Sequence, residues 1–170
     1  MPRIQPFTII KDTREQEGYT FEPSSSRYHK CNGMVERKLD TGDYSLEGLE
    51  DKVCIERKAS VVELANNIGH DMVRFTNEIE RMKSFPHRFM IFEFSLSDVM
   101  DFPERSNIPE EDWGKLKVTN KFILRRIMEF QMHHDIHVMF CDGKKHAKWA
   151  VLSILKRINE IYDLGGENAS

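Results

Sequence analysis

The 170-residue sequence has no apolar run close to the ~20 residues that a helix needs to cross a bilayer. Its N-terminal stretch places Pro2, Arg3 and Pro6 where a signal peptide requires unbroken apolar residues. These absences argue against a membrane-spanning chain and predict a cytoplasmic protein. Internal repeats and low-complexity tracts are absent too, and the length suits one domain, so we expect a single domain over residues 1–170.

Cysteine and net positive charge are also scarce. Cys31, Cys54 and Cys141 are too far apart for a Cys-x-x-Cys pair, which predicts reduced thiols. The net charge is −3, so the chain is not a polycation that coats nucleic acid non-specifically. Residues 115–126 and 143–157 nevertheless carry lysines and arginines without any acid. Two such segments fit a phosphate-rich partner, although charge runs more often form a solvated surface.

Short apolar runs alternate with longer segments of helical period, which is typical of an α/β domain. Strands are expected at residues 7–11, 34–40, 52–58, 88–94 and 136–141, and the last two are apolar enough to be buried central strands. Helices are expected after Ser60, which forms a capping box with Glu63, and at residues 72–82, 118–133 and 146–162. Residues 95–114 contain two prolines and several acids, and we expect them to form a surface connection.

The predicted strand at residues 52–58 carries the residues best suited to chemistry. Because side chains alternate along a strand, Cys54, Glu56 and Lys58 share one face and Arg57 points from the other. A carboxylate beside an ammonium, with a further acid nearby, is the arrangement that a metal-dependent phosphodiesterase needs. Carboxylates hold Mg²⁺, which polarises the phosphate and lowers the pKa of a bound water. The lysine steadies the nucleophile or the developing charge.

The further acid is Asp43, which follows Gly42, and a glycine there lets the backbone turn the carboxylate into a cleft. Upstream, Asp12 and Glu15 end the first predicted strand on either side of Arg14. Each of these short motifs, taken alone, more often has no catalytic role and is simply a turn, a charged strand edge or a strand end. Their joint order is more specific.

Taken in order, the chain contains Asp-x-Arg-Glu, Gly-Asp, Glu-Arg-Lys and Arg-Phe-x-x-x-Ile-x-Arg-Met. These motifs are Asp12, Arg14 and Glu15; Gly42 and Asp43; Glu56, Arg57 and Lys58; and Arg74, Phe75, Ile79, Arg81 and Met82. This order resembles the nuclease domain of the XPF/MUS family of structure-specific endonucleases. The resemblance runs from about residue 8 to residue 94 by motif, and to about residue 162 by the order of elements.

The resemblance implies an α/β, restriction-endonuclease-like (PD-(D/E)xK) core with a mixed central sheet flanked by helices. It also implies dependence on Mg²⁺, with Mn²⁺ able to substitute, and cleavage of DNA at branches, flaps or junctions during repair or recombination. A bacterial or phage member would be associated with the nucleoid. Family members dimerise through the end of the nuclease domain, so we expect a homodimer through the C-terminal helices. A dimer would explain the wide apolar face of residues 146–162, where Trp149 is expected to pack in the core or at an interface.

The resemblance also assigns roles to individual residues. The expected catalytic residues are Asp12, Glu15, Asp43, Glu56, Arg57 and Lys58. The expected metal ligands are Asp43, Glu56 and Asp12, and the expected phosphate contacts are Arg14, Arg74 and Arg81.

Three features depart from the family pattern. The family usually has an acid four residues after the motif lysine, where this chain has Val62; either Glu63 replaces that acid or, as we favour slightly, it only caps the helix. A second Glu-Arg-Lys at residues 36–38 precedes the Gly-Asp pair, and we expect it to be strand surface. No helix-hairpin-helix domain follows the nuclease motifs, which predicts a bare nuclease domain, either truncated or a stand-alone enzyme of a phage or bacterium.

Two other functions compete with a branched-DNA endonuclease. Val62 favours a catalytically silent DNA-binding or scaffolding subunit, whereas the seven intact charged residues of the first three motifs argue against that loss. An exonuclease or resolvase on the same core is the second rival, because loops and dimer arrangement set substrate geometry.

Overall fold

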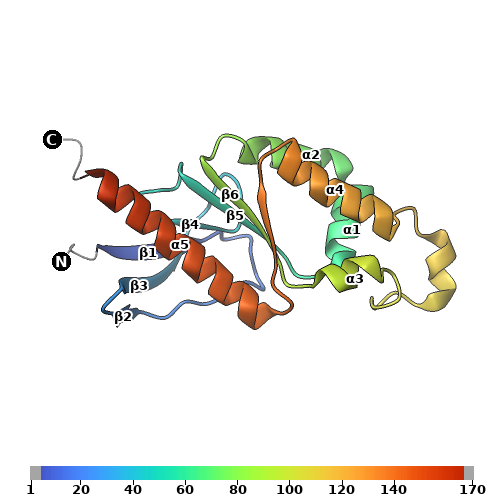
Figure 1. Cartoon of the computed structure of the whole chain (residues 1–170), viewed down its shortest axis with the longest axis horizontal. Helices are drawn as coiled ribbons and strands as arrows, with labels where there is room; N and C mark the ends of the chain where they lie inside the picture. Colours follow the sequence, from blue (N-terminus) through green and yellow to red (C-terminus); the bar gives the residue numbers. More distant parts are fainter. Residues whose placement is uncertain (1–4, 167–170) are drawn as a thin grey trace.

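A mixed seven-stranded sheet forms the centre of the computed structural model, which describes residues 5–166 (Figure 1). The strands are β1 (Pro6–Lys11), β2 (Ser24–Ser26), β3 (His29–Glu36), β4 (Tyr44–Leu46), β5 (Val53–Lys58), β6 (His87–Phe92) and β7 (His137–Phe140). Their order across the sheet is β2-β3-β1-β4-β5-β6-β7. The pairs β1–β3, β5–β6 and β6–β7 are parallel and the other three pairs are antiparallel. Parts of the expected 1–170 domain, residues 1–4 and 167–170, lie outside the described residues.

Three of the described helices begin at a residue whose side chain caps them. The helices are α1 (Val61–Gly69), α2 (Met72–Met82), α3 (Leu96–Met100), α4 (Asn120–Met132), α5 (Lys144–Gly166) and a 3-10 helix at Glu110–Lys115. Ser60, Ser95 and Thr119 each accept a hydrogen bond from the backbone N–H three residues later, at α1, α3 and α4. Such a bond satisfies one of the N–H groups that the first helical turn leaves free. In the described part of the chain, no helix is both long and apolar enough to cross a membrane.

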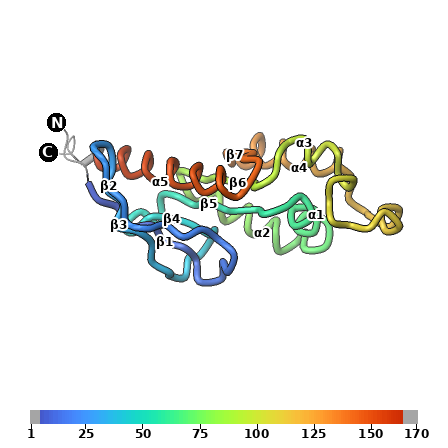
Figure 2. Tube along the Cα trace, turned by 90° about the horizontal axis from the view of Figure 1, so that it is seen from below, coloured from blue at the N-terminus to red at the C-terminus, as the bar shows by residue number. Residues whose placement is uncertain are grey.

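Two apolar cores lie on the two faces of the sheet. One contains Cys54 and Met90 together with α1, α2 and α4, and the other contains Val53 and Ile55 together with α5. Alternation along β5 thus sends neighbouring side chains into different cores. Figure 2 shows α5 and α2 on opposite sides of the strands.

The structure corrects three of the expectations about secondary structure. The strand expected at residues 34–40 is β3, which begins at His29 and ends at Glu36. Residues 95–114 are not only a surface connection, because they form α3 and bury Val99 and Phe102 in the first core. The strand expected to be central at residues 136–141 is β7, which lies at the edge of the sheet, and its side chains are only partly buried.

Candidate active site

The turn before β4 places Asp43 beside β5. Gly42 has a φ of +84°, and a Cβ there would lie 2.6 Å from Cys54 Sγ, so only glycine fits this turn without strain. The N–H of Asp43 donates to the carbonyl of Ile55 at 2.8 Å. Its Oδ2 accepts from the backbone N–H of Arg57 at 2.7 Å. Burial first, and then the neighbouring Glu56 carboxylate, raise the pKa of Asp43 well above its ordinary value.

Glu56 and Lys58 project from the same face of β5, as the alternation predicts. Both are buried, and Lys58 Nζ donates to Glu56 Oε1 at 2.8 Å. Burial raises the pKa of Glu56 to about 8 even though Lys58 lies beside it. Burial lowers the pKa of Lys58, but the carboxylates of Glu56 and Glu78 outweigh it, so that pKa lies above its ordinary value. The lysine therefore stays charged at neutral pH.

Arg57 points to the other side of the sheet, where it joins a buried polar network. Its Nε donates to Glu93 Oε1 at 2.6 Å, and its Nη1 lies 3.4 Å from Glu15 Oε1. The hydroxyl of Tyr19 donates to the same Glu93 oxygen at 2.7 Å. The structure thus separates Arg57 from the expected metal ligands and uses it to hold the loop after β1.

Asp12 holds two chain segments together. Its Oδ1 accepts from the N–H of Leu39 at 2.7 Å, and its Oδ2 accepts from Arg14 Nε at 2.7 Å. The N–H of Asp12 donates to the carbonyl of Asp43 at 2.8 Å. Although burial raises the pKa of Asp12, the Arg14 guanidinium and two backbone N–H groups outweigh it and leave that pKa low. Both oxygens of the Asp12 carboxylate already accept hydrogen bonds, which argues against Asp12 as a metal ligand.

Glu63 caps α1 and also lines the candidate cavity. Its N–H donates to Ser60 Oγ at 3.1 Å, and its Oε2 accepts from the N–H of Ala59 at 2.8 Å, so it completes the cap of α1. Its Oε1 also lies 4.0 Å from Lys58 Nζ. Val62 instead packs against the first core.

One cavity of about 400 Å³ is lined by nearly all of the expected site residues. Every one of them lines it except Arg57: Asp12, Arg14, Glu15, Asp43, Glu56, Lys58, Arg74 and Arg81. The motifs that carry these residues span about 70 positions of the chain, and the fold brings them to one place. Sequence reasoning missed Glu78, which also lines the cavity and comes within hydrogen-bonding distance of Glu56. Its position on α2, one turn after Arg74 on the polar face, was the available signal.

The donor set of this cavity fits a hard divalent cation. Asp43, Glu56 and Glu78 offer carboxylate oxygens, which Mg²⁺ prefers. The Glu78 carboxylate adds to the rise in the pKa of Glu56, and a bound cation would offset such repulsion. Within residues 5–166, however, no three Asp, Glu, His or Cys side chains are already arranged around one ion position.

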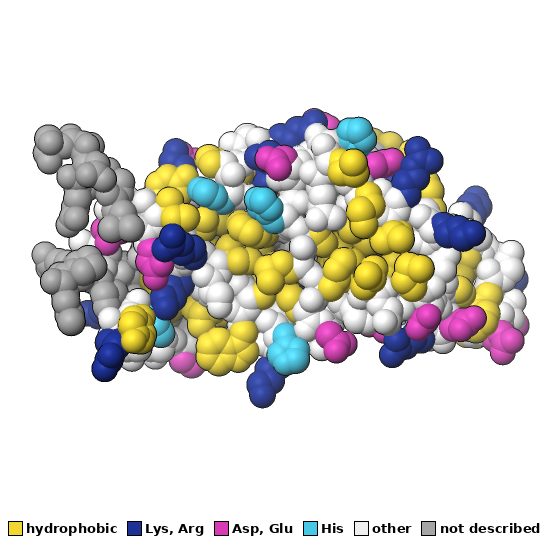
Figure 3. Space-filling view, viewed as in Figure 1, with side chains coloured by type: hydrophobic (Ala, Val, Ile, Leu, Met, Phe, Trp, Pro, Cys, Tyr) yellow, Lys and Arg dark blue, Asp and Glu magenta, His cyan; other side chains and the backbone are white. Residues whose placement is uncertain are grey.

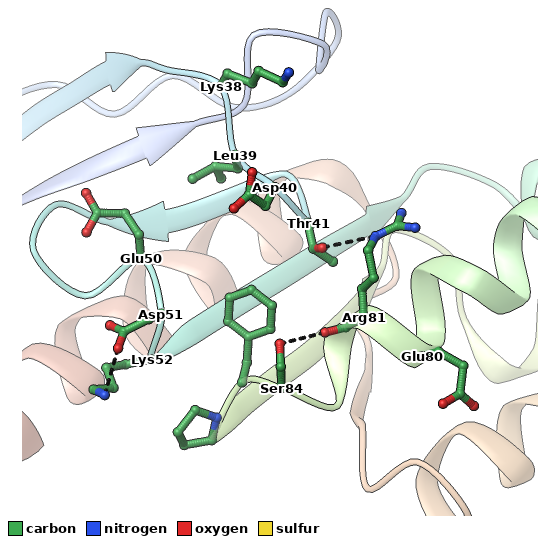
Figure 4. Close-up of a pocket in the computed structure, with 12 residues that line it drawn as sticks. Lys38, Leu39, Asp40, Thr41, Glu50, Asp51, Lys52, Glu80, Arg81 and Ser84 are labelled. Atoms are coloured by element: carbon green, nitrogen blue, oxygen red, sulfur yellow. Dashed lines mark hydrogen bonds and ion pairs between the residues drawn. The ribbon is translucent and has the colours of Figure 1, made fainter.

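A second cavity of about 770 Å³ adjoins the first and shares Asp40, Thr41 and Arg81 with it (Figure 4). Arg81 Nε donates to Thr41 Oγ1 at 3.3 Å at this border. The second cavity mixes acids and bases along its lining, and none of the expected metal ligands lines it. Among the two cavities, the expected metal ligands therefore line the smaller one.

Comparisons with known proteins point to one family and one fold. The family model of the ERCC4 domain matches residues 11–150. The fold is similar to that of XPF from Aeropyrum pernix, with a TM-score of 0.56 and 16% identity over 89% of this chain and 60% of that chain. A structure of XPF from Aeropyrum pernix in complex with DNA also has a TM-score of 0.56 and 16% identity, over 91% of this chain and 65% of that chain.

The chain thus spans between 60% and 65% of the length of these solved chains. No curated protein matches the sequence. The structural likeness confirms the restriction-endonuclease-like fold, with its mixed sheet and flanking helices.

Proposed function

This chain belongs to the ERCC4 domain family, and on that premise we propose that it is a divalent-metal-dependent endonuclease that hydrolyses DNA at or near branches, flaps or junctions. The observation that carries the proposal is the single cavity in which Asp43, Glu56 and Lys58 meet. Nuclease domains of this family generally use a divalent metal. Mg²⁺ is the proposed ion, and Mn²⁺ would substitute for it.

Asp43 and Glu56 would hold the cation, and Glu78 is the third candidate ligand. When bound, a divalent cation stabilises charge on the phosphate and lowers the pKa of a bound water. Lys58 stays charged and buried, so it supplies a hydrogen-bond donor to the negative charge that develops on the phosphate. Asp12 and Glu15 act by positioning, since Asp12 anchors Leu39 and Glu15 contacts Arg57.

The arginines around the cavity suit a phosphate backbone. Arg14, in the loop after β1, and Arg74 and Arg81, both on α2, line it. Among the described residues, Arg14 forms an ion pair with one of these acids, through Asp12 Oδ2, and Arg74 and Arg81 form none. Each phosphate that they neutralise would steepen the salt dependence of duplex binding by about 0.9 log units per log unit of salt.

An apolar surface supports the proposed homodimer. On α4, β7 and α5, Met132 is 80% exposed, Trp149 is 60% exposed and Met139 is exposed as well. β7 is also an edge strand, whose unpaired backbone groups can bond to another chain. Most of the apolar face of α5 covers its own sheet, through Val151 and Leu155, so only part of that face remains for a partner. Figure 3 shows apolar side chains gathered across this side of the molecule.

The test is cleavage of labelled flapped, splayed, nicked, four-way and linear DNAs by the wild type and by Asp43→Asn, in Mg²⁺, in Mn²⁺ and in EDTA. We expect the wild type to cut branched DNA in either metal, and Asp43→Asn to bind DNA without cutting it. Equal cutting by Asp43→Asn would show that Asp43 is no ligand. Binding to junctions without any cutting would support the silent subunit instead. Cutting from linear ends only would support an exonuclease.

A separate measurement tests the dimer. Light scattering should give twice the mass of the 20.0 kDa chain for the wild type. Met132→Glu combined with Trp149→Glu should give a monomer, because two charges would be buried in the interface. A monomeric wild type at micromolar concentration would contradict the proposed interface.

A further inference from the structure

A row of lysines along α5 faces the loop and hairpin that contain residues 17–31. Lys144 Nζ donates to the carbonyl of Glu17 at 2.9 Å. Lys148 Nζ lies 5.6 Å from the ring centre of Phe21, and Lys156 Nζ lies 5.9 Å from that of Tyr28. Twelve residues of helix separate the first lysine from the last, which is about 18 Å at 1.5 Å per residue. The row therefore has the length of several nucleotides.

Tyr28 is the aromatic side chain most open to a ligand here. It stands in the turn between β2 and β3 and is 65% exposed. The guanidinium of Arg27 lies over this ring at 5.6 Å from its centre, and Lys156 Nζ lies over it at 5.9 Å. An exposed ring next to cations can stack on a base while the cations contact phosphates.

Positive charge predominates on this surface, although Glu17 and Glu22 lie in the loop that the lysines face. Residues 24–35 and 143–159 contain seven lysines and arginines and no acid, although the whole chain has a net charge of −3. In the described structure, no salt bridge joins Arg27, Lys148 or Lys156 to a carboxylate. Two segments more than 100 positions apart in the chain thus combine into one basic surface with an aromatic residue.

This surface lies away from the candidate active site. Glu56 and Lys58 face the cavity beside α1 and α2, whereas α5 packs on the opposite face of the sheet, beneath Val53 and Ile55. None of the α5 lysines lines the catalytic cavity. A strand bound here would be held without reaching the metal site.

We propose that Arg27, Tyr28, Lys148 and Lys156 form a second nucleic-acid site, which binds single-stranded DNA. Tyr28 stacks on a base, and the three cations contact the phosphates on either side of it. The choice of DNA over other polyanions rests on the proposed nuclease function. The site would hold the unpaired strand of a branched substrate while the duplex lies at the catalytic cavity.

The test is binding of a fluorescent oligothymidylate of about 15 nucleotides, measured by anisotropy in EDTA so that no strand is cut. Tyr28→Ala should weaken binding about tenfold and Tyr28→Phe should not, because the ring alone stacks. Lys148→Gln with Lys156→Gln should reduce the salt slope by about 1.4, at roughly 0.7 per phosphate of a single strand. Lys117→Gln with Lys121→Gln removes the same charge at the start of α4 and serves as the matched control.

The outcomes separate this inference from the proposed nuclease. Equal loss in both lysine pairs, or no loss in Tyr28→Ala, would overturn the site. If Tyr28→Ala weakened binding of a blunt duplex of the same length as much as it weakens binding of the single strand, stacking on an unpaired base would be overturned. Cleavage of branched DNA is assayed separately in Mg²⁺. A chain that binds the single strand through Tyr28 but cuts nothing supports this site and refutes the nuclease.

Discussion

The chain contains the tripeptide Glu-Arg-Lys twice, and the two copies have opposite environments. The first copy ends β3: the side chain of Glu36 is 61% exposed, and Arg37 forms surface ion pairs with Glu47 and Glu50. The second copy is the buried end of β5, where the side chain of Glu56 is only 8% exposed. Identical residue types therefore form a solvated strand end in one place and the centre of the candidate site in the other.

The difference arises from what lies against each strand. β3 pairs with β1 and the short β2 near one edge of the sheet, and its end meets solvent. β5 lies between β4 and β6, with a core on each face. Burial keeps the second copy out of water, which shifts its pKa values and strengthens its electrostatic interactions. Paired substitutions in the two copies test whether burial decides function.

The largest contrast should come from the glutamates. Glu56→Gln should reduce the cleavage rate by on the order of 1,000-fold, because it removes a carboxylate that would hold the cation. Glu36→Gln should leave the rate close to wild type, since Glu36 contacts only Lys11. Single-turnover cleavage of a flapped DNA in Mg²⁺ measures both. Similar losses in the two variants would remove the distinction between the copies.

The next largest difference in activity should come from the lysines of the two copies. Lys58→Ala should lower turnover by about 100-fold with the affinity for Mn²⁺ nearly unchanged, because a buried donor to the phosphate is lost. The matched variant Lys38→Ala changes an exposed side chain and should keep nearly all activity. Turnover and Mn²⁺ titration, measured on the same preparations, separate catalysis from metal binding. Full turnover in Lys58→Ala would exclude this lysine from the reaction.

Substitutions of the arginines in the two copies should differ in their effect on the stability of the protein. Arg57→Ala should lower the free energy of unfolding by about 3–5 kcal/mol, since it leaves the buried Glu93 carboxylate without its cation. Arg37→Ala should cost no more than about 1 kcal/mol, as is usual for surface pairs. Urea unfolding gives both values. Equal costs would contradict the burial of the Arg57 network.

The smallest contrast concerns pH. Glu56 has a pKa raised from 4.5 to about 8, so the folded chain binds a proton that the unfolded chain releases. This carboxyl group therefore stabilises the fold below about pH 4.5, and that contribution is lost as the pH rises through 8. Without metal, the melting temperature should fall between pH 5 and pH 8, and should fall less in Glu56→Gln than in Glu36→Gln. Parallel curves for the two variants would contradict the shifted pKa.

Much of the fold could be predicted from periodicity and caps. β5, α1 and α2 lie within a residue or so of their expected positions, because their apolar residues recur at the period of a strand or helix and Ser60 caps α1. The short strands β2 and β4 were missed, since three residues are too few to show a period. β3 ends before residue 40 because Asp12 binds the N–H of Leu39 and draws the chain out of the sheet.

The sequence by itself determined the order of motifs and the alternation that sets Glu56 and Lys58 apart from Arg57, because these follow from local geometry. Only the tertiary structure decided which Glu-Arg-Lys is buried. It also decided that Glu78 lies near Glu56 and that both carboxylate oxygens of Asp12 accept hydrogen bonds. It also brought Tyr28 beside Lys156. Such contacts join residues far apart in the chain, and burial depends on every element packed around them, so no local pattern encodes them.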